Sequence, residues 1–162
     1  TDVVTVTIDS GADDLTTLSV DFKSDDEPTL TSAQTTALRY DADAFVADDK
    51  GDLDVTGLAN LTSVTVSGTA GDINIDANPN LTSVTISADA KDLYLVDNDN
   101  MTSVNVTGAK FGDIEVSGNA DLATLVLNST TALRSTSTSA AEKSVTLNVN
   151  SNPELTSLTA SM

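Results

Sequence analysis

Residues 71–90 read GDINIDANPNLTSVTISADA, and residues 91–110 read KDLYLVDNDNMTSVNVTGAK, which are two copies of one repeat. The same pattern begins at residue 51 as GDLDVTGLANLTSVTVSGTA and at residue 111 as FGDIEVSGNADLATLVLNS. A late copy follows at residues 144–162. The chain is therefore built on a repeat of about twenty residues, a period typical of stacked repeat architectures.

Within each copy, the apolar residues fall in two short runs that alternate with polar residues. In residues 71–90 the first run contains Ile73 and Ile75, and the second contains Leu81, Val84 and Ile86. Because successive side chains of a strand point to opposite faces, each run predicts a strand with an apolar row inward and a polar row outward. A unit this short cannot bury its own apolar row, so the units must stack as coils of a solenoid with parallel strands.

An asparagine separates the two predicted strands of most coils. Its amide can bond the backbone of its own turn and of the neighbouring coil, which predicts an asparagine ladder along one corner. The ladder positions are Asn78, Asn98, Asn119 and Asn152. Leu58 occupies this place in the coil that begins at residue 51, so that coil departs from the ladder.

The spacing resembles the short leucine-rich pattern L-x-L-x-x-N-x-x-L, which stands at Ile73 to Leu81 and at Leu147 to Leu155. The strings GDLDV, GDINI, GDIEV, NPNLTS and NPELTS are similar to those of the right-handed, helix-free solenoids of receptor L domains and of bacterial surface-layer and adhesin proteins. This resemblance covers residues 51–127 and 144–160. It implies an architecture, and because such folds host many unrelated activities, it does not by itself fix a function.

The fold class expected is all-β: a right-handed parallel β-solenoid with two short strands per coil and one short helical insertion. We expect one solenoid domain over residues 1–162, as a segment of a longer chain. Its parts are a degenerate first coil at 1–20, an insertion or cap at 21–50, regular coils at 51–127, a loop insertion at 128–143 and a last coil at 144–162.

The helix is expected within the first insertion. Pro28 bars a helix upstream, and the string TSAQTTALRY at residues 31–40 can form a short helix capped by Thr31 or Ser32. Leu38, Tyr40, Phe45 and Val46 would pack it over the end or side of the solenoid.

The composition argues against several classes of function. The 162 residues carry a formal net charge of -18, with 7 Lys and Arg against 25 Asp and Glu, and contain neither His nor Cys. Such a chain repels nucleic acid and anionic membranes. Without His, the chain lacks the commonest general base, and without Cys it lacks thiolate ligands and nucleophiles. An evenly repeated row of acidic residues also offers no distinct pair of a general acid and a general base. We therefore expect that the protein is not an enzyme. No apolar run has membrane-spanning length.

Acidic residues form an outward row beside the first strand of each coil, one strand spacing apart at about 4.8 Å. Like charges placed opposite each other are destabilising. Calcium, which takes six to eight oxygen ligands, would relieve the repulsion. The alternative is that each Asp is a turn residue and that the acidity keeps the protein soluble. The candidate calcium ligands are Asp48, Asp49, Asp52, Asp54, Asp72, Asp76, Asp92, Asp97, Asp99, Asp113 and Glu115, with Asp41 and Asp43 beside them.

The outward row of the second strand is rich in hydroxyl groups. It offers a flat candidate binding face for a glycan, a peptide or ice, although Ser, Thr and Asn on a solvated strand also need no ligand. Its members include Ser63, Thr65, Ser83, Thr85, Ser103 and Asn105. N-glycosylation patterns occur at Asn60, Asn80, Asn100, Asn105 and Asn128, and three of these are by-products of the repeat.

The sequence therefore predicts an extracellular structural module of a bacterial cell surface, of surface-layer or adhesin type, that is rigidified or assembled through calcium. Its expected partners are copies of itself or neighbouring domains. A binding module that uses the Ser/Thr face for a glycan, a peptide or ice is the alternative.

Overall fold

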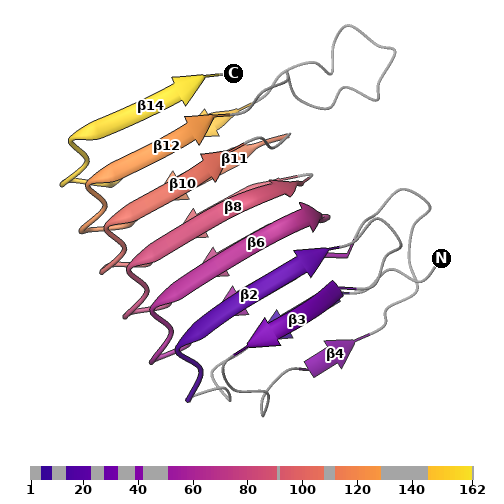
Figure 1. Ribbon diagram of the computed structural model, residues 1–162. Coiled ribbons are helices and arrows are strands. Elements are labelled where there is room, and N and C mark those ends of the chain that lie inside the picture. The colour runs from indigo at the N-terminus through magenta and orange to yellow at the C-terminus, as the bar shows by residue number, and fades with distance from the viewer. Residues whose placement is uncertain are drawn as a thin grey trace, which may run out of the picture.

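A computed structural model describes residues 5–8, 14–22, 28–32, 39–41, 51–90, 92–107, 112–128 and 146–161. These residues form two seven-stranded sheets and no helix. Figure 1 shows the sheets lying face to face, with each coil contributing one strand to each sheet.

Sheet A contains the first strand of each coil. In spatial order its strands are β13 (Leu147–Asn148), β11 (Ile114–Ser117), β9 (Leu93–Val96), β7 (Ile73–Asp76), β5 (Leu53–Thr56), β1 (Thr5–Ile8) and β4 (Arg39–Asp41). Sheet B contains the second strand of each coil. Its strands are β14 (Ser157–Ser161), β12 (Thr124–Asn128), β10 (Ser103–Thr107), β8 (Ser83–Asp89), β6 (Ser63–Thr69), β2 (Thr17–Phe22) and β3 (Pro28–Ser32).

Equivalent residues of successive repeats lie side by side. Leu53 pairs with Ile73, and Ile73 pairs with Leu93, in parallel strands. Ile114 pairs with Leu147 in the same way, although 33 residues separate the two coils there instead of 20. The parallel all-β architecture with two strands per repeat that the sequence predicts is therefore confirmed.

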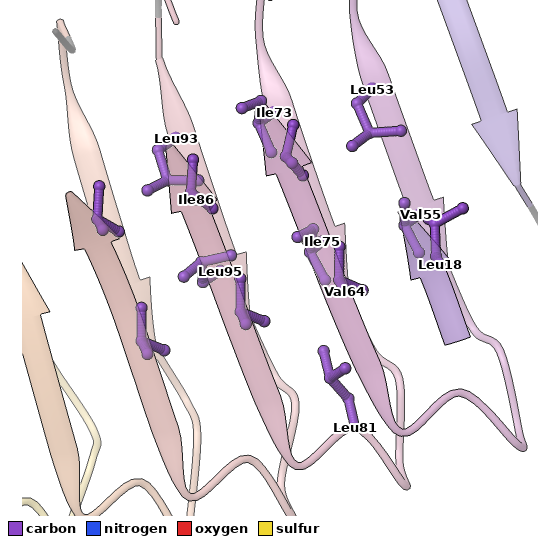
Figure 2. Packing of buried hydrophobic residues seen from close by; sticks show 14 of the residues in the cluster. Leu18, Leu53, Val55, Val64, Ile73, Ile75, Leu81, Ile86, Leu93 and Leu95 are labelled. Atoms are coloured by element: carbon purple, nitrogen blue, oxygen red, sulfur yellow. The ribbon is translucent and has the colours of Figure 1, made fainter. Parts of the chain in front are cut away.

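The core lies between the two sheets. Strands of sheet A alternate between buried and partly exposed residues, as in Ile73–Asp76, and β8 alternates in the same way. Figure 2 shows the inward side chains of successive coils arranged in rows, with Ile73, Ile75 and Leu81 among them. Because both sheets turn their apolar side chains inward, a single continuous core runs along the stack.

The predicted helix over residues 31–40 is wrong at both of its ends. Thr31 and Ser32 belong to β3, which pairs antiparallel with β2, and Arg39 and Tyr40 belong to β4, which pairs antiparallel with β1. The exposed edge of each sheet supplies hydrogen-bond partners that outweigh a weak local helix propensity. Pro28 fits this arrangement, because an edge strand tolerates a residue without an N–H group. Residues 33–38 lie outside the described residues.

Candidate functional site

The outer surface of sheet A carries the acidic row predicted from the sequence. Asp52, Asp72, Asp92 and Asp113 each precede a strand of this sheet. The second residues of β5, β7, β9 and β11 form a further column on this surface. In order along the stack they are Asp54, Asn74, Tyr94 and Glu115. Asp48 and Asp49 lie outside the described residues, and Asp99 lies in an exposed turn.

The carboxylates that precede the strands link one coil to the next. The Oδ1 atom of Asp52 accepts the backbone N–H of Asp72 at 2.7 Å, and that of Asp92 accepts the N–H of Asp113 at 2.7 Å. Asp113 Oδ1 in turn accepts the N–H of Thr146 at 2.9 Å. Hydrogen bonds to an ionised acceptor are stronger than neutral ones. At these positions the charged carboxylates therefore hold neighbouring coils together.

The carboxylates inside the strands are held by neighbouring polar groups. Asp54 Oδ1 accepts the Thr56 hydroxyl at 2.8 Å and the Asn74 amide at 3.1 Å. Glu115 Oε1 accepts the Ser117 hydroxyl at 2.8 Å and the Asn148 amide at 3.3 Å. Uncharged Asn74 and Tyr94 separate Asp54 from Glu115, so like charges do not stand directly opposite each other in this column.

Asp76, the last residue of β7, is a partly buried carboxyl that lies near Asp97 and Asp54. Partial burial raises its pKa above the usual value, and the charges of Asp97 and Asp54 raise it further. A hydrogen bond from the Ala77 backbone acts in the opposite direction. The folded protein therefore binds a proton at Asp76 more readily than the unfolded chain does.

Replacing Asp76 with asparagine should stabilise the fold at neutral pH by about 0.5 kcal/mol, because the repulsion from Asp97 and Asp54 disappears. Since the folded-state pKa is raised, the wild type loses stability relative to the variant as pH rises through that pKa. The two proteins should converge below pH of about 3.9, the usual aspartate pKa. Urea unfolding across this pH range measures the difference. Asp121→Asn, at an exposed turn, is the control, and an equal gain there would contradict the assignment.

No three acidic side chains of the described residues come together as a metal ion would require. Three carboxylates of the column that precedes the strands, Asp52, Asp92 and Asp113, accept hydrogen bonds from the next coil. Calcium binding stays a prediction. A nearby cation would favour the charged form of Asp76, whose pKa is raised by partial burial and by the charges of Asp97 and Asp54.

The asparagine ladder occupies the corner between the sheets, and Asn78, Asn98 and Asn119 are fully buried. Each side-chain oxygen accepts the backbone N–H of the ladder position one coil earlier: Leu58 donates to Asn78, Asn78 to Asn98, and Asn98 to Asn119, at 3.0 to 3.1 Å. The Nδ2 group of Asn98 donates to the Ile75 and Val96 carbonyls at 2.9 Å. Asn152 ends the series by accepting from Asn119.

The residue before each ladder position has a left-handed backbone. The φ angles are 68° at Gly57, 54° at Ala77, 52° at Asp97, 69° at Gly118 and 55° at Ser151. A Cβ atom on Gly118 would collide with Oδ1 of Asp97, which belongs to the preceding coil. Both the conformation and the close approach therefore favour glycine at this position.

Gly118→Ala is expected to cost about 1 to 2 kcal/mol through its left-handed backbone, with an added cost from the collision with Asp97. The added cost should vanish when Asp97 is also replaced by glycine. Urea unfolding of the two single variants and the double variant yields the coupling energy directly. If the stability changes of the two single variants simply added up in the double variant, the Asp97 side chain would not collide with a side chain at position 118.

The same connection between the two sheets carries a further set of hydrogen bonds, which the repeat pattern alone did not predict. The Thr62, Thr82 and Thr102 hydroxyls donate to the carbonyls of Thr16, Thr62 and Thr82 at 2.8 to 3.1 Å. The Asn80 and Asn100 amides donate to the carbonyls of Ala59 and Pro79 at 2.6 Å. The signal was present in the recurring Asn-x-Thr triplets, which match glycosylation patterns but here form a further ladder.

The Ser/Thr face is the outer surface of sheet B. Thr65, Thr85 and Asn105 lie in register on β6, β8 and β10, and all three are exposed. Ser63, Ser83 and Ser103 form the adjacent row and are partly buried. Val126 interrupts the exposed row on β12. The structure thus brings the predicted face together over three strands.

Comparison with known protein families, with characterised proteins and with solved structures finds no match to this chain. Among the described residues, no helix is long and apolar enough to cross a membrane.

Proposed function

We propose that this chain is a structural module, a right-handed parallel β-solenoid that acts as a stiff spacer in a secreted bacterial cell-surface protein of surface-layer or adhesin type. The observation that carries the proposal is that the recurring polar residues form hydrogen bonds between neighbouring coils. Asparagine, aspartate and threonine each form a ladder of hydrogen bonds from coil to coil. A spacer that resists stretching needs such hydrogen bonds between neighbouring coils.

The handedness follows from a general rule of chain connection. Each strand of sheet A reaches the next parallel strand of that sheet through a crossover that includes a strand of sheet B. Crossovers between parallel strands are right-handed in about 98% of cases. The surface setting rests on the resemblance of the repeat strings and on the acidic, cysteine-free composition.

Single-molecule stretching tests the spacer role. The chain is placed between two marker domains of known unfolding force and pulled from its two ends. We expect a clear unfolding force, followed by lengthening of about 3.3 to 3.6 Å for each released residue. A chain that extends without resistance before the marker domains yield would refute the proposal.

Calcium is expected to raise the thermal unfolding midpoint, because an ion that binds only the folded state stabilises it. The comparison uses calcium, magnesium and a chelator at one ionic strength, so that general screening of the net charge of -18 is held constant. A rise specific to calcium supports rigidification by the ion. If calcium did not raise the unfolding midpoint more than magnesium does, the spacer would work without calcium.

A binding module on the Ser/Thr face is the second candidate. The exposed register of Thr65, Thr85 and Asn105 favours it. Replacing all three with alanine should abolish binding to a glycan or peptide array, or to ice, and leave the unfolding midpoint nearly unchanged. Retained binding would exclude this face.

A further inference from the structure

The first coil, which contributes β1 and β2, carries an insertion of definite length. In sheet B, 46 residues separate Thr16 from its partner Thr62, whereas 20 residues separate Thr62 from its partner Thr82. The first coil is therefore 26 residues longer than the second. The additional residues lie between the end of β2 and the start of β5, where β3 and β4 also occur.

The insertion does not disturb the stacking of the coil that contains it. β1 pairs in parallel with β5, and β2 pairs in parallel with β6. The regular coils that follow pair in the same way, as β5 does with β7 and β6 with β8. The register of the first coil is therefore that of a coil without an insertion, and the inserted residues are not needed to set it.

β3 and β4 run along the two strands of the first coil. β3 pairs antiparallel with β2, and β4 pairs antiparallel with β1, as Figure 1 shows for β2 and β3. On their other sides, β2 and β1 pair with β6 and β5. Both backbone edges of β1 and of β2 are therefore occupied. An unoccupied edge would offer its N–H and C=O groups to another chain.

The apolar core is also covered at this place. Ile8, Leu18 and Val20 of the first coil are at most 1% exposed, like Val84 and Ile86 of a central coil. In the described part of the chain, the first coil has a neighbouring coil on one side only. The elements described on its other side are β3 and β4. They therefore take the place of a covering coil for the apolar row.

We propose that β3 and β4 form an edge cap, which keeps β1 and β2 from pairing with a second copy of this chain. Every copy carries the same two edges, and contacts between identical surfaces are the commonest kind in protein dimers. The direction of the cap strands supports this role, because a further coil of the stack would pair in parallel. The cap goes beyond the spacer role, which concerns a single chain under tension.

Deleting residues 24–49 removes the cap and restores a coil of regular length. The deletion leaves two residues between Phe22 and Gly51, as there are between their partners Gly68 and Gly71 in the next coil. Sedimentation velocity compares this variant with the wild type at an ionic strength that screens the net charge of -18. We expect the deletion to lower the dissociation constant for self-association at least tenfold.

Deleting residues 130–142 is the matched control. The coil that contains them spans 33 residues instead of 20, so this deletion also restores the regular length, but it leaves β1 to β4 intact. It should not change self-association. A single spin label at Ser19 of β2 should report a short distance between copies of the 24–49 deletion variant. Self-association no stronger than that of the wild type, or only long distances from Ser19, would overturn the proposal.

A second variant detaches β3 without shortening the chain. It combines Leu30→Pro with Thr31→Pro, and because neighbouring N–H groups of a strand point to opposite sides, one of the two prolines removes a hydrogen bond to β2. This variant should also self-associate, with circular dichroism confirming that each variant folds. In the wild type, amide hydrogen exchange should be as slow in β2 as in β6. Fast exchange in β2 would show an open edge and would refute the cap, even if the deletion variant did not fold.

Discussion

Replacing Asn98 with alanine is expected to lower the free energy of unfolding by about 3 to 5 kcal/mol, because several buried hydrogen bonds are lost at once. The Asn78 N–H loses its acceptor, and the Ile75 and Val96 carbonyls lose a donor. Domains of this size are stable by only about 5 to 15 kcal/mol. Urea unfolding should show a large drop in the midpoint.

Asn105→Ala is the matched control for this experiment. Asn105 belongs to the same repeat but lies exposed on β10. Its replacement should change stability by no more than about 0.5 kcal/mol. If the two variants lost equal stability, the ladder would not hold the coils together.

Placing a carboxyl group in the core should unfold the chain. Ile86→Asp is expected to cost about 5 kcal/mol or more, since it removes a fully buried apolar side chain and buries a polar group without partners. The neighbouring Thr85→Asp should be tolerated, because Thr85 points outward between Thr65 and Asn105, which carry no charge. Circular dichroism and thermal unfolding separate the two outcomes. A folded Ile86→Asp protein, or an unfolded Thr85→Asp protein, would contradict the assignment of faces.

Periodicity was sufficient to predict the repeated part of the fold. Alternation at Ile73 and Ile75, and at Val84 and Ile86, specifies which face is buried, and equal spacing specifies which strands pair. The Asn98 ladder position follows from the same spacing. The sequence alone could not show that Thr31 and Tyr40 lie in strands, because their partners β2 and β1 exist only once the stack has formed.

The acidic row shows a second limit of sequence reasoning. The pattern places Asp52 and Asp92 on the outer surface, but their oxygens bond backbone N–H groups one coil away. Whether an outward carboxylate holds a cation or a backbone group depends on distances of an ångström or less, which spacing does not encode. For the same reason, the glycosylation pattern at Asn80 does not show that the Thr82 hydroxyl donates to the Thr62 carbonyl of the neighbouring coil.

Distances between pairs of spin labels test most directly whether the coils stack in register. The chain contains no cysteine, so labels attach only where cysteines are introduced. Ser19, Val126 and Thr159 lie in one register row of sheet B, with Val126 four strands and Thr159 five strands from Ser19. In an excess of unlabelled chain, the stack predicts about 19 Å for the Ser19–Val126 pair and about 24 Å for the Ser19–Thr159 pair. Equal distances, or a broad distribution for both pairs, would contradict the account.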